Sequence, residues 1–193
     1  PRPVVATICL CGAIVVAVGA RQVPPTEQPR GDGLVAASQV AADARSPRNA
    51  NYEIDARLDE EAKSIHGRET IRWRNITDQA TSELQFHLYW NAWRDSQSTW
   101  LRERRMAGLF TPPPADAWSS MDISALRLRE PSGEMRDVTK DMRFIAPDDG
   151  NARDQTVMTV PLGRSVGPNE SVEIEVEWTA KIPRPFARTG WIG

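Results

Sequence analysis

Few residue types in this chain have the chemistry for an active site, and their spacing does not assemble one. The two histidines are His66 and His87, and both cysteines, Cys9 and Cys11, lie in an apolar run at the N-terminus. Zinc sites take three or four ligands, mostly nitrogen and sulfur. The residues from 51 onward cannot supply such a set from His and Cys, so we predict no metal ligand in this chain.

Complete catalytic motifs are also missing from the sequence. There is no H-E-x-x-H and no phosphate-binding glycine loop, and the G-x-S-x-G match from Gly163 to Gly167 lies between two predicted strands and precedes no predicted helix, so it does not form a nucleophile elbow. We interpret His66 as an exposed or hydrogen-bonded strand residue. His87 is expected to bond a neighbouring backbone group or loop, because no base or nucleophile partner for it is identifiable. We therefore predict no catalytic residue, no cofactor-binding residue and no cofactor in this chain.

The acidic residues leave one enzymatic alternative open. Pairs such as Asp148-Asp149 fall in expected turns, where solvated carboxylates are common. The carboxylate pair of a glycosidase meets in space rather than in the chain, so the sequence does not exclude such a pair.

The seven tryptophans are many for this length, and four of them, Trp90, Trp93, Trp100 and Trp118, gather in the irregular centre of the chain. Two interpretations apply. The favoured one is structural: Trp73 and Trp178 fill a sheet core, and the central tryptophans pack a loop or dock another domain. The other is that the central tryptophans form a sugar-binding platform. If exposed, they mark an interface.

The elements that position these residues are predicted by period-two alternation, which is typical of half-buried strands. Apolar residues alternate with polar ones over 52–58, 65–73, 84–88, 158–162 and 172–178, and shorter candidates cover 123–130 and 142–145. In the last long run Glu173, Glu175 and Glu177 are expected to face water. Residues 97–108 permit a short helix before three prolines.

Roughly seven or eight short strands separated by turn residues indicate an all-β fold. We predict an antiparallel sandwich or a saddle-like curved sheet with one short helical excursion. No βαβ alternation and no internal repeat is found. The formal net charge of -2, with basic and acidic residues mixed along the chain, makes nucleic acid an unsuitable partner.

The N-terminal part has a different composition. Residues 3–20 carry no charge, and Val18-Gly19-Ala20 fits a signal-peptidase site, so residues 1–20 are predicted to be a signal peptide or, as the competing interpretation, an uncleaved anchor. Residues 21–50, rich in proline, glycine and polar residues, are predicted to be a flexible linker, and 51–193 the folded domain. The protein is then exported: periplasmic, secreted or membrane-anchored, with membrane contact only if the first segment is retained.

Several segments together resemble a known family. Ile65-x-Gly67-x-Glu69, Trp73-x-Asn75 and the run from Leu84 to Ala92 are similar to the N-terminal β-domain of aminopeptidase N-like zinc metallopeptidases, of the bacterial secreted type. The segment from Pro183 to Gly190 resembles the exit from that domain. The resemblance covers about residues 51–193.

The resemblance implies a fragment that lacks the catalytic domain. It implies a non-catalytic domain that packs on the catalytic domain of the same polypeptide and roofs the cleft, with residues 186–191 near the inter-domain surface. The parent protein would hydrolyse peptide bonds near the N-terminus of a peptide substrate, with zinc in the missing catalytic domain. Two alternatives remain: a stand-alone extracytoplasmic β-sandwich that binds a glycan or a protein, and a purely structural envelope domain.

Overall fold

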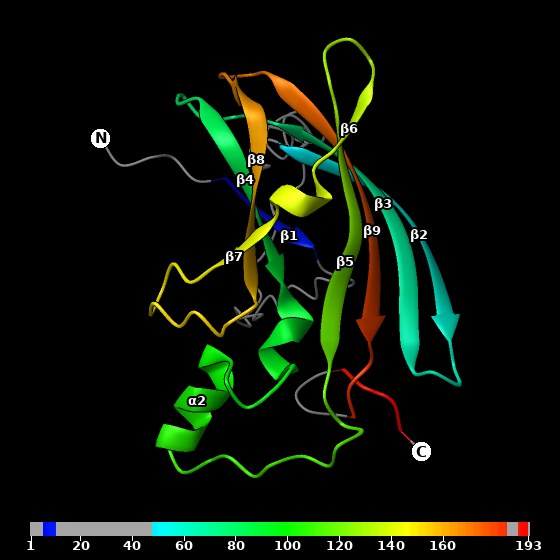
Figure 1. The fold of residues 1–193 in the computed structure, drawn as a ribbon, viewed down its shortest axis with the longest axis vertical. Helices are drawn as coiled ribbons and strands as arrows, with labels where there is room; N and C mark the ends of the chain where they lie inside the picture. The colour runs from blue at the N-terminus through cyan, green and yellow to red at the C-terminus, as the bar shows by residue number, and fades with distance from the viewer. Residues whose placement is uncertain (1–5, 11–47, 185–188, 193) are drawn as a thin grey trace, which may run out of the picture. The chain divides into compact units, whose positions relative to one another are not determined.

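The computed structural model describes residues 6–10, 48–184 and 189–192, and these form two β-sheets with one α-helix (Figure 1). One sheet has four strands in the order β1-β4-β8-β7, and the other has five in the order β2-β3-β9-β5-β6. The chain divides into a unit of residues 1–11 and 49–193 and a unit of residues 12–48, and the second lies almost entirely outside the described residues.

The four-stranded sheet is mostly antiparallel. Its strands are β1 (Ala6–Leu10), β4 (Thr81–Leu88), β8 (Val157–Val166) and β7 (Arg143–Ile145). β8 pairs with β4 and β7 in antiparallel fashion, whereas β1 pairs with β4 in parallel. Part of the predicted signal segment therefore has strand backbone, while the rest of residues 1–20 lies outside the described residues.

The five-stranded sheet is wholly antiparallel. Its strands are β2 (Ala50–Asp59), β3 (Ser64–Arg74), β9 (Ser171–Lys181), β5 (Ser120–Arg129) and β6 (Met135–Asp137). β3 and β9 pair over eleven positions, from Ser64 opposite Lys181 to Arg74 opposite Ser171. The β5–β9 ladder contains a register shift between Ile123 and Ala125, so Ser124 is an inserted residue at a bulge.

The core lies between the two sheets, because alternate residues of each strand point inward. Phe86, Leu84 and Val160 come from the four-stranded sheet, and Ile71, Ile174 and Val176 from the five-stranded sheet, and each is fully buried. The apolar alternation found in the sequence thus gives one shared core, and the predicted all-β sandwich is confirmed.

The α-helix and the 3-10 helix that precedes it lie at one end of the sandwich (Figure 1). A 3-10 helix, η1 (Tyr89–Trp93), continues directly from β4, and α2 (Thr99–Met106) follows it. The predicted helix within 97–108 is confirmed. A second 3-10 turn, η2 (Thr139–Asp141), and the strand β6 were not predicted. Among the described residues, no helix is long and apolar enough to cross a membrane.

The glutamates on the outer face of β9 were predicted to face water, and Glu173 and Glu177 also form ion pairs with neighbouring strands. Glu173 forms ion pairs with Arg72 of β3 at 2.7 Å and with Arg129 of β5 at 2.6 Å. Glu177 similarly contacts Arg68 and Arg127. Each carboxylate therefore bridges three neighbouring strands on the outer face of the sheet.

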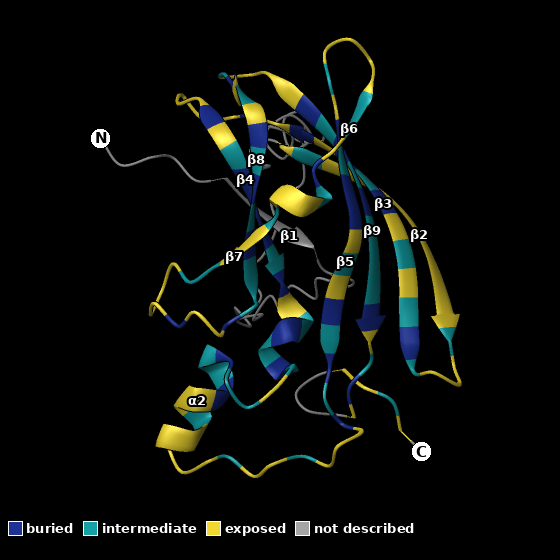
Figure 2. Ribbon diagram, viewed as in Figure 1, coloured by how far each residue is buried: buried dark blue, intermediate teal, exposed yellow. Residues whose placement is uncertain are grey.

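The edge strand β2 is the most exposed strand of the five-stranded sheet (Figure 2). Its register places Tyr52 opposite the buried Ile71 and Ile54 opposite Glu69, so both belong to the inner face. Nevertheless Tyr52, Ile54 and Leu58 are 44%, 50% and 53% exposed. The four-stranded sheet does not extend over this strand.

Candidate functional site

Four aromatic rings line up where β4 runs into the helical end of the molecule. The rings of His87 and Tyr89 have centroids 5.2 Å apart, those of Tyr89 and Trp93 are 5.9 Å apart, and those of Trp93 and Trp100 are 6.0 Å apart. All three contacts are edge-to-face, a favourable geometry for aromatic pairs. We call these four residues the aromatic row.

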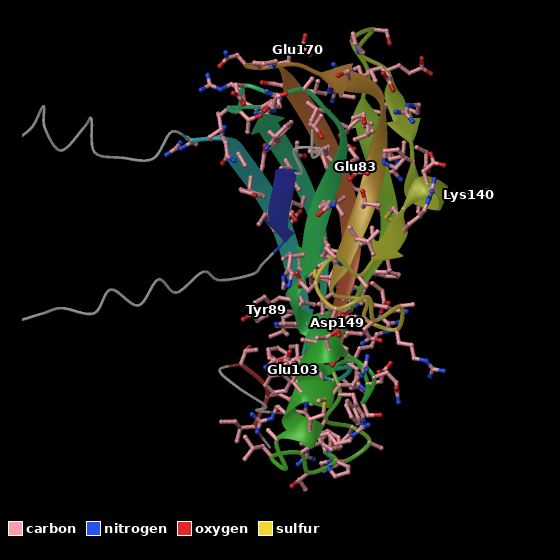
Figure 3. The ribbon with its side chains drawn as sticks, turned by 90° about the vertical axis from the view of Figure 1, so that its left-hand side faces the viewer. Glu83, Tyr89, Glu103, Lys140, Asp149 and Glu170 are labelled. Carbon is pink, nitrogen blue, oxygen red and sulfur yellow. The ribbon has the colours of Figure 1, made fainter. Side chains whose placement is uncertain are left out.

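Tyr89 is the member of the aromatic row that meets solvent. Its side chain is 52% exposed, whereas Trp93 is only 5% exposed. Figure 3 shows Tyr89 projecting away from the ribbon at the end of β4. Edge contacts with His87 and Trp93 hold the ring from two sides, and its hydroxyl makes no hydrogen bond within the described part of the chain. Tyr89 thus offers a restrained apolar ring and a polar group whose hydrogen-bonding capacity is available.

The backbone beneath the aromatic row is fixed by one buried amide. Asn91, only 1% exposed, accepts a hydrogen bond from the backbone N–H of Met121 at 2.7 Å. Its Nδ2 donates to the carbonyl oxygens of Met121, at 3.1 Å, and Gln155, at 2.9 Å. The side chain therefore ties η1 to β5 and to the segment before β8, satisfying backbone groups that would otherwise be buried without a partner.

The helix that carries Trp100 is fixed in the same way. Ser98 is the N-cap of α2: its Oγ accepts from the Leu101 N–H at 3.3 Å and donates to the Ala92 carbonyl at 2.6 Å. Asp154 accepts from the Thr99 N–H at 3.0 Å, near the positive end of the helix dipole. The acidic segment 148–154 is thereby held against the start of α2.

The surroundings of His87 carry negative charge. Burial of the imidazole lowers its pKa, and the nearby carboxylates of Asp154 and Asp148 oppose that fall. The ring is therefore neutral at neutral pH, with one nitrogen able to donate and the other to accept. The exposed ring of Tyr89 therefore lies beside a neutral imidazole, with the exposed carboxylate of Asp148 close enough to act on that imidazole.

A second concavity lies on the five-stranded sheet. This groove of about 380 Å³ is lined mainly by residues of β2, β3 and β9, namely Asp55, Arg57, His66, Gly67, Arg68, Ser124, Glu177, Trp178 and Thr179. His66 bonds Ser64 at 3.2 Å and Thr179 at 3.1 Å. This confirms the prediction of a hydrogen-bonded strand histidine. Glu177 in this groove is already paired with Arg68 and Arg127.

One buried acid was not recognised as special in the sequence. Glu69 lies on the inner face of β3 and is 4% exposed. Burial raises its pKa to about 7, and the neighbouring Trp178 indole works in the opposite direction. The alternation of β3 already placed Glu69 among Gly67, Ile71 and Trp73, so its inward direction was readable from the sequence, whereas the depth of its burial was not.

The tryptophans divide between the two interpretations. Trp73 is 3% exposed in the core, and Trp90 packs against the core. Trp93 and Trp100 join the aromatic row, while Tyr89, the exposed member, had been assigned no role.

Among the described residues, no group of three or more His, Cys, Asp and Glu side chains is arranged to hold a metal ion. Residues 186–188 of the expected inter-domain segment 186–191 lie outside the described residues.

Comparison with known proteins finds similar chains among the solved structures. No family model matches the chain, and no curated protein matches it. Among solved structures, it is similar to the CBM3a-L domain with flanking linkers from scaffoldin cipA of the Clostridium thermocellum cellulosome, with 11% identity and a TM-score of 0.32, covering 74% of this chain and 72% of that chain. The family 3a carbohydrate-binding module from the same scaffolding gives 11% identity and a TM-score of 0.31, covering 74% and 81%.

These comparisons contradict the predicted family. Both solved structures are carbohydrate-binding modules, and no family model links the chain to the zinc aminopeptidases. The assignment to a metallopeptidase N-terminal domain is therefore corrected, together with the peptide substrate, the hydrolytic parent and its zinc. At TM-scores of 0.32 and 0.31, however, the likeness to the modules does not itself assign a function to this chain.

The residues that carried the resemblance have structural roles. Leu84, Phe86 and Leu88 fill the core, Gly67 lies under the ring of Trp178, and Asn91 bonds three backbone groups. A sequence that must satisfy the same packing has these residues whatever it binds. The shared pattern therefore reports local folding requirements.

Proposed function

We propose that this chain is a non-catalytic glycan-binding module that works outside the cytoplasm, and that a sugar ring stacks on Tyr89. The observation that carries the proposal is the half-exposed ring of Tyr89, restrained by edge contacts with His87 and Trp93. A pyranose presents a face of C–H groups that packs on an aromatic ring. Its hydroxyl groups then need donors and acceptors around that ring.

The charge around the aromatic row favours a neutral glycan. Asp148 and Asp154 lie close enough to His87 to act on its pKa, so the field there is negative. An anionic sugar would meet like charge, whereas neutral hydroxyl groups can donate to carboxylates. We infer a neutral hexose-based oligosaccharide as the ligand class. Export of the chain, and any neighbouring domain in the same polypeptide, are parts of this proposal.

The two tyrosines of the chain provide a matched test. Neutral and acidic oligosaccharides are screened first, and the best soluble ligand is then titrated by calorimetry against the wild type, Tyr89→Ala and Tyr52→Ala. We expect Tyr89→Ala to weaken binding by about five- to thirtyfold, since a stacking contact is worth ~1–2 kcal/mol. Tyr52, on the exposed edge strand, serves as the control and should leave the affinity unchanged. Equal affinities for Tyr89→Ala and the wild type would contradict the proposal.

A further inference from the structure

We propose that the β2 edge pairs with a second copy of this chain, in antiparallel fashion, with Asp55 on the two-fold axis. β2 is a ten-residue strand, and within the described residues it pairs only with β3. No described strand pairs with its other edge, and an edge of this kind presents backbone N–H and C=O groups that can pair with another strand. The proposal concerns a surface away from Tyr89 and stands independently of glycan binding.

The sequence of β2 lacks most of the usual protection of an edge strand. Natural edges are blunted by proline, charged side chains (especially lysine), bulges or short length, and of these β2 has only the charges on its outer face. β2 contains no proline, glycine or lysine, and its register with β3 runs without a shift from Ala50 to Asp59. Three large apolar side chains on its inner face, Tyr52, Ile54 and Leu58, are about half exposed. This strand is long, regular and apolar on one face, as a strand that pairs with another chain must be.

The charge pattern of β2 favours a second copy of this chain as the partner that pairs with its edge. With Asp55 on the axis, Glu53 lies opposite the partner's Arg57, and the symmetry repeats this opposite-charge pair. On the inner face Tyr52 lies opposite the partner's Leu58, and Ile54 opposite the partner's Ala56. Directly opposed pairs of these kinds stabilise antiparallel ladders. The surface is therefore self-complementary, as a two-fold interface requires.

Other registers are less favourable. A one-residue slip would set apolar residues against charged ones, because the faces of a strand alternate. A shift of two residues in one direction puts Glu53 opposite the partner's Asp55. The opposite shift puts Glu53 opposite the partner's Asp59 and shortens the overlap. The chosen register has one unfavourable pair, Asp55 with the partner's Asp55, and the ladder places Arg68 beside each of these carboxylates.

The repulsive pair of Asp55 side chains on the axis gives the sharpest test. Sedimentation equilibrium of the full chain, at concentrations up to about 1 mM, detects a dimer whose free energy of association is only ~4 kcal/mol. Asp55→Asn removes the repulsion on the axis and is expected to tighten the dimer about fivefold. Arg57→Glu should weaken the dimer about tenfold, since it reverses two symmetry-related pairs. The double swap Glu53→Arg with Arg57→Glu should restore it.

Crosslinking checks the register directly. In a chain with Cys9→Ser and Cys11→Ser, Asp55→Cys should form a disulfide-linked dimer on mild oxidation, because opposed Cβ atoms lie ~5 Å apart. Asn51→Cys, far from the axis, is the control and should form no disulfide-linked dimer under the same conditions. Circular dichroism confirms that each variant is folded. A chain that stays monomeric throughout, or equal crosslinking of the two cysteine variants, would overturn the proposal.

Discussion

The six-membered ring of Trp178 on β9 occupies the space above Gly67 on β3 that a side chain at residue 67 would fill. The two residues are directly opposed in the ladder, so the ring lies across the neighbouring strand. A Cβ at residue 67 would overlap Cε2 and Cζ2 of the indole. Glycine is thus required here by a close approach, since its backbone has no special conformation in this strand.

Gly67→Ala is predicted to lower the free energy of unfolding by ~1–3 kcal/mol, because the methyl group overpacks the site and displaces Trp178. Urea denaturation measures the change. Gly167→Ala is the control, since a Cβ there would meet the Glu170 side chain at an ordinary 3.6 Å. In a Trp178→Ala background the cost of Gly67→Ala should largely vanish, and an unchanged cost in that background would contradict the assigned contact.

Glu69→Gln is predicted to stabilise the protein at pH 8 and to change the pH dependence of its stability. The pKa of Glu69 is raised to about 7 from 4.5, so the native state holds a proton that the unfolded state releases. Stability from this group is therefore full below about pH 4.5 and is lost as the pH rises through about 7. The raised pKa corresponds to ~3 kcal/mol, and because the glutamine amide is itself a buried polar group, we expect a gain of roughly 1–2 kcal/mol for the variant at pH 8. Urea denaturation at pH 5 and pH 8 gives the measurement, and an equal effect at both values would contradict it.

Glu173→Gln is expected to act in the opposite direction with pH. Hydrogen bonds from Arg72 and then Arg129 hold the pKa of Glu173 below its usual range. Its contribution is therefore present above the unfolded pKa of about 4.5 and is lost as the pH falls through the lowered value. Because these ion pairs are largely solvated, the cost at pH 7 is only ~0.5–1 kcal/mol and should shrink in high salt. Thermal unfolding at low and high ionic strength is the measurement. A packing defect would lower the stability equally at both, so a loss that does not depend on salt would contradict the ion-pair explanation.

Asn91→Ala should damage both stability and the aromatic row. It removes the partners of the Met121 backbone N–H and of two carbonyl groups, so we expect a loss of ~2–3 kcal/mol. Glycan affinity should fall as well, although Asn91 is buried and cannot touch the ligand. Tyr89→Ala should instead reduce affinity with little loss of stability. Parallel calorimetry and urea denaturation of the two variants test this separation, which fails if Asn91→Ala binds as tightly as the wild type.

The sequence predicted most of the fold because alternation records which face of each strand is buried. β2 and β3 were located within two residues at each end and β9 within three, and the helix predicted within 97–108, before the prolines at 112–114, contains α2. β6 is only three residues long, which is too short for a periodic pattern. The ion pairs of Glu173 join β3, β9 and β5, and such pairs depend on strand order, which alternation does not record.

The candidate site was only partly predictable. The central tryptophans pointed to the correct region, but exposure of Tyr89 depends on how η1 and α2 pack, and this is fixed by hydrogen bonds from Asn91 and Ser98 to distant backbone groups. The family resemblance misled because Gly67 and Asn91 are needed for packing, and packing requirements do not identify a ligand.

The most direct test of the account uses the fact that the chain has two tyrosines, Tyr52 and Tyr89. Ring-labelled tyrosine gives one set of NMR signals for each, and Tyr89→Phe assigns them. Titration with a soluble neutral oligosaccharide should shift the Tyr89 signals through the stacked sugar and leave those of Tyr52 in place. If a bound oligosaccharide leaves Tyr89 unshifted, the glycan does not bind on the aromatic row and the central claim is wrong.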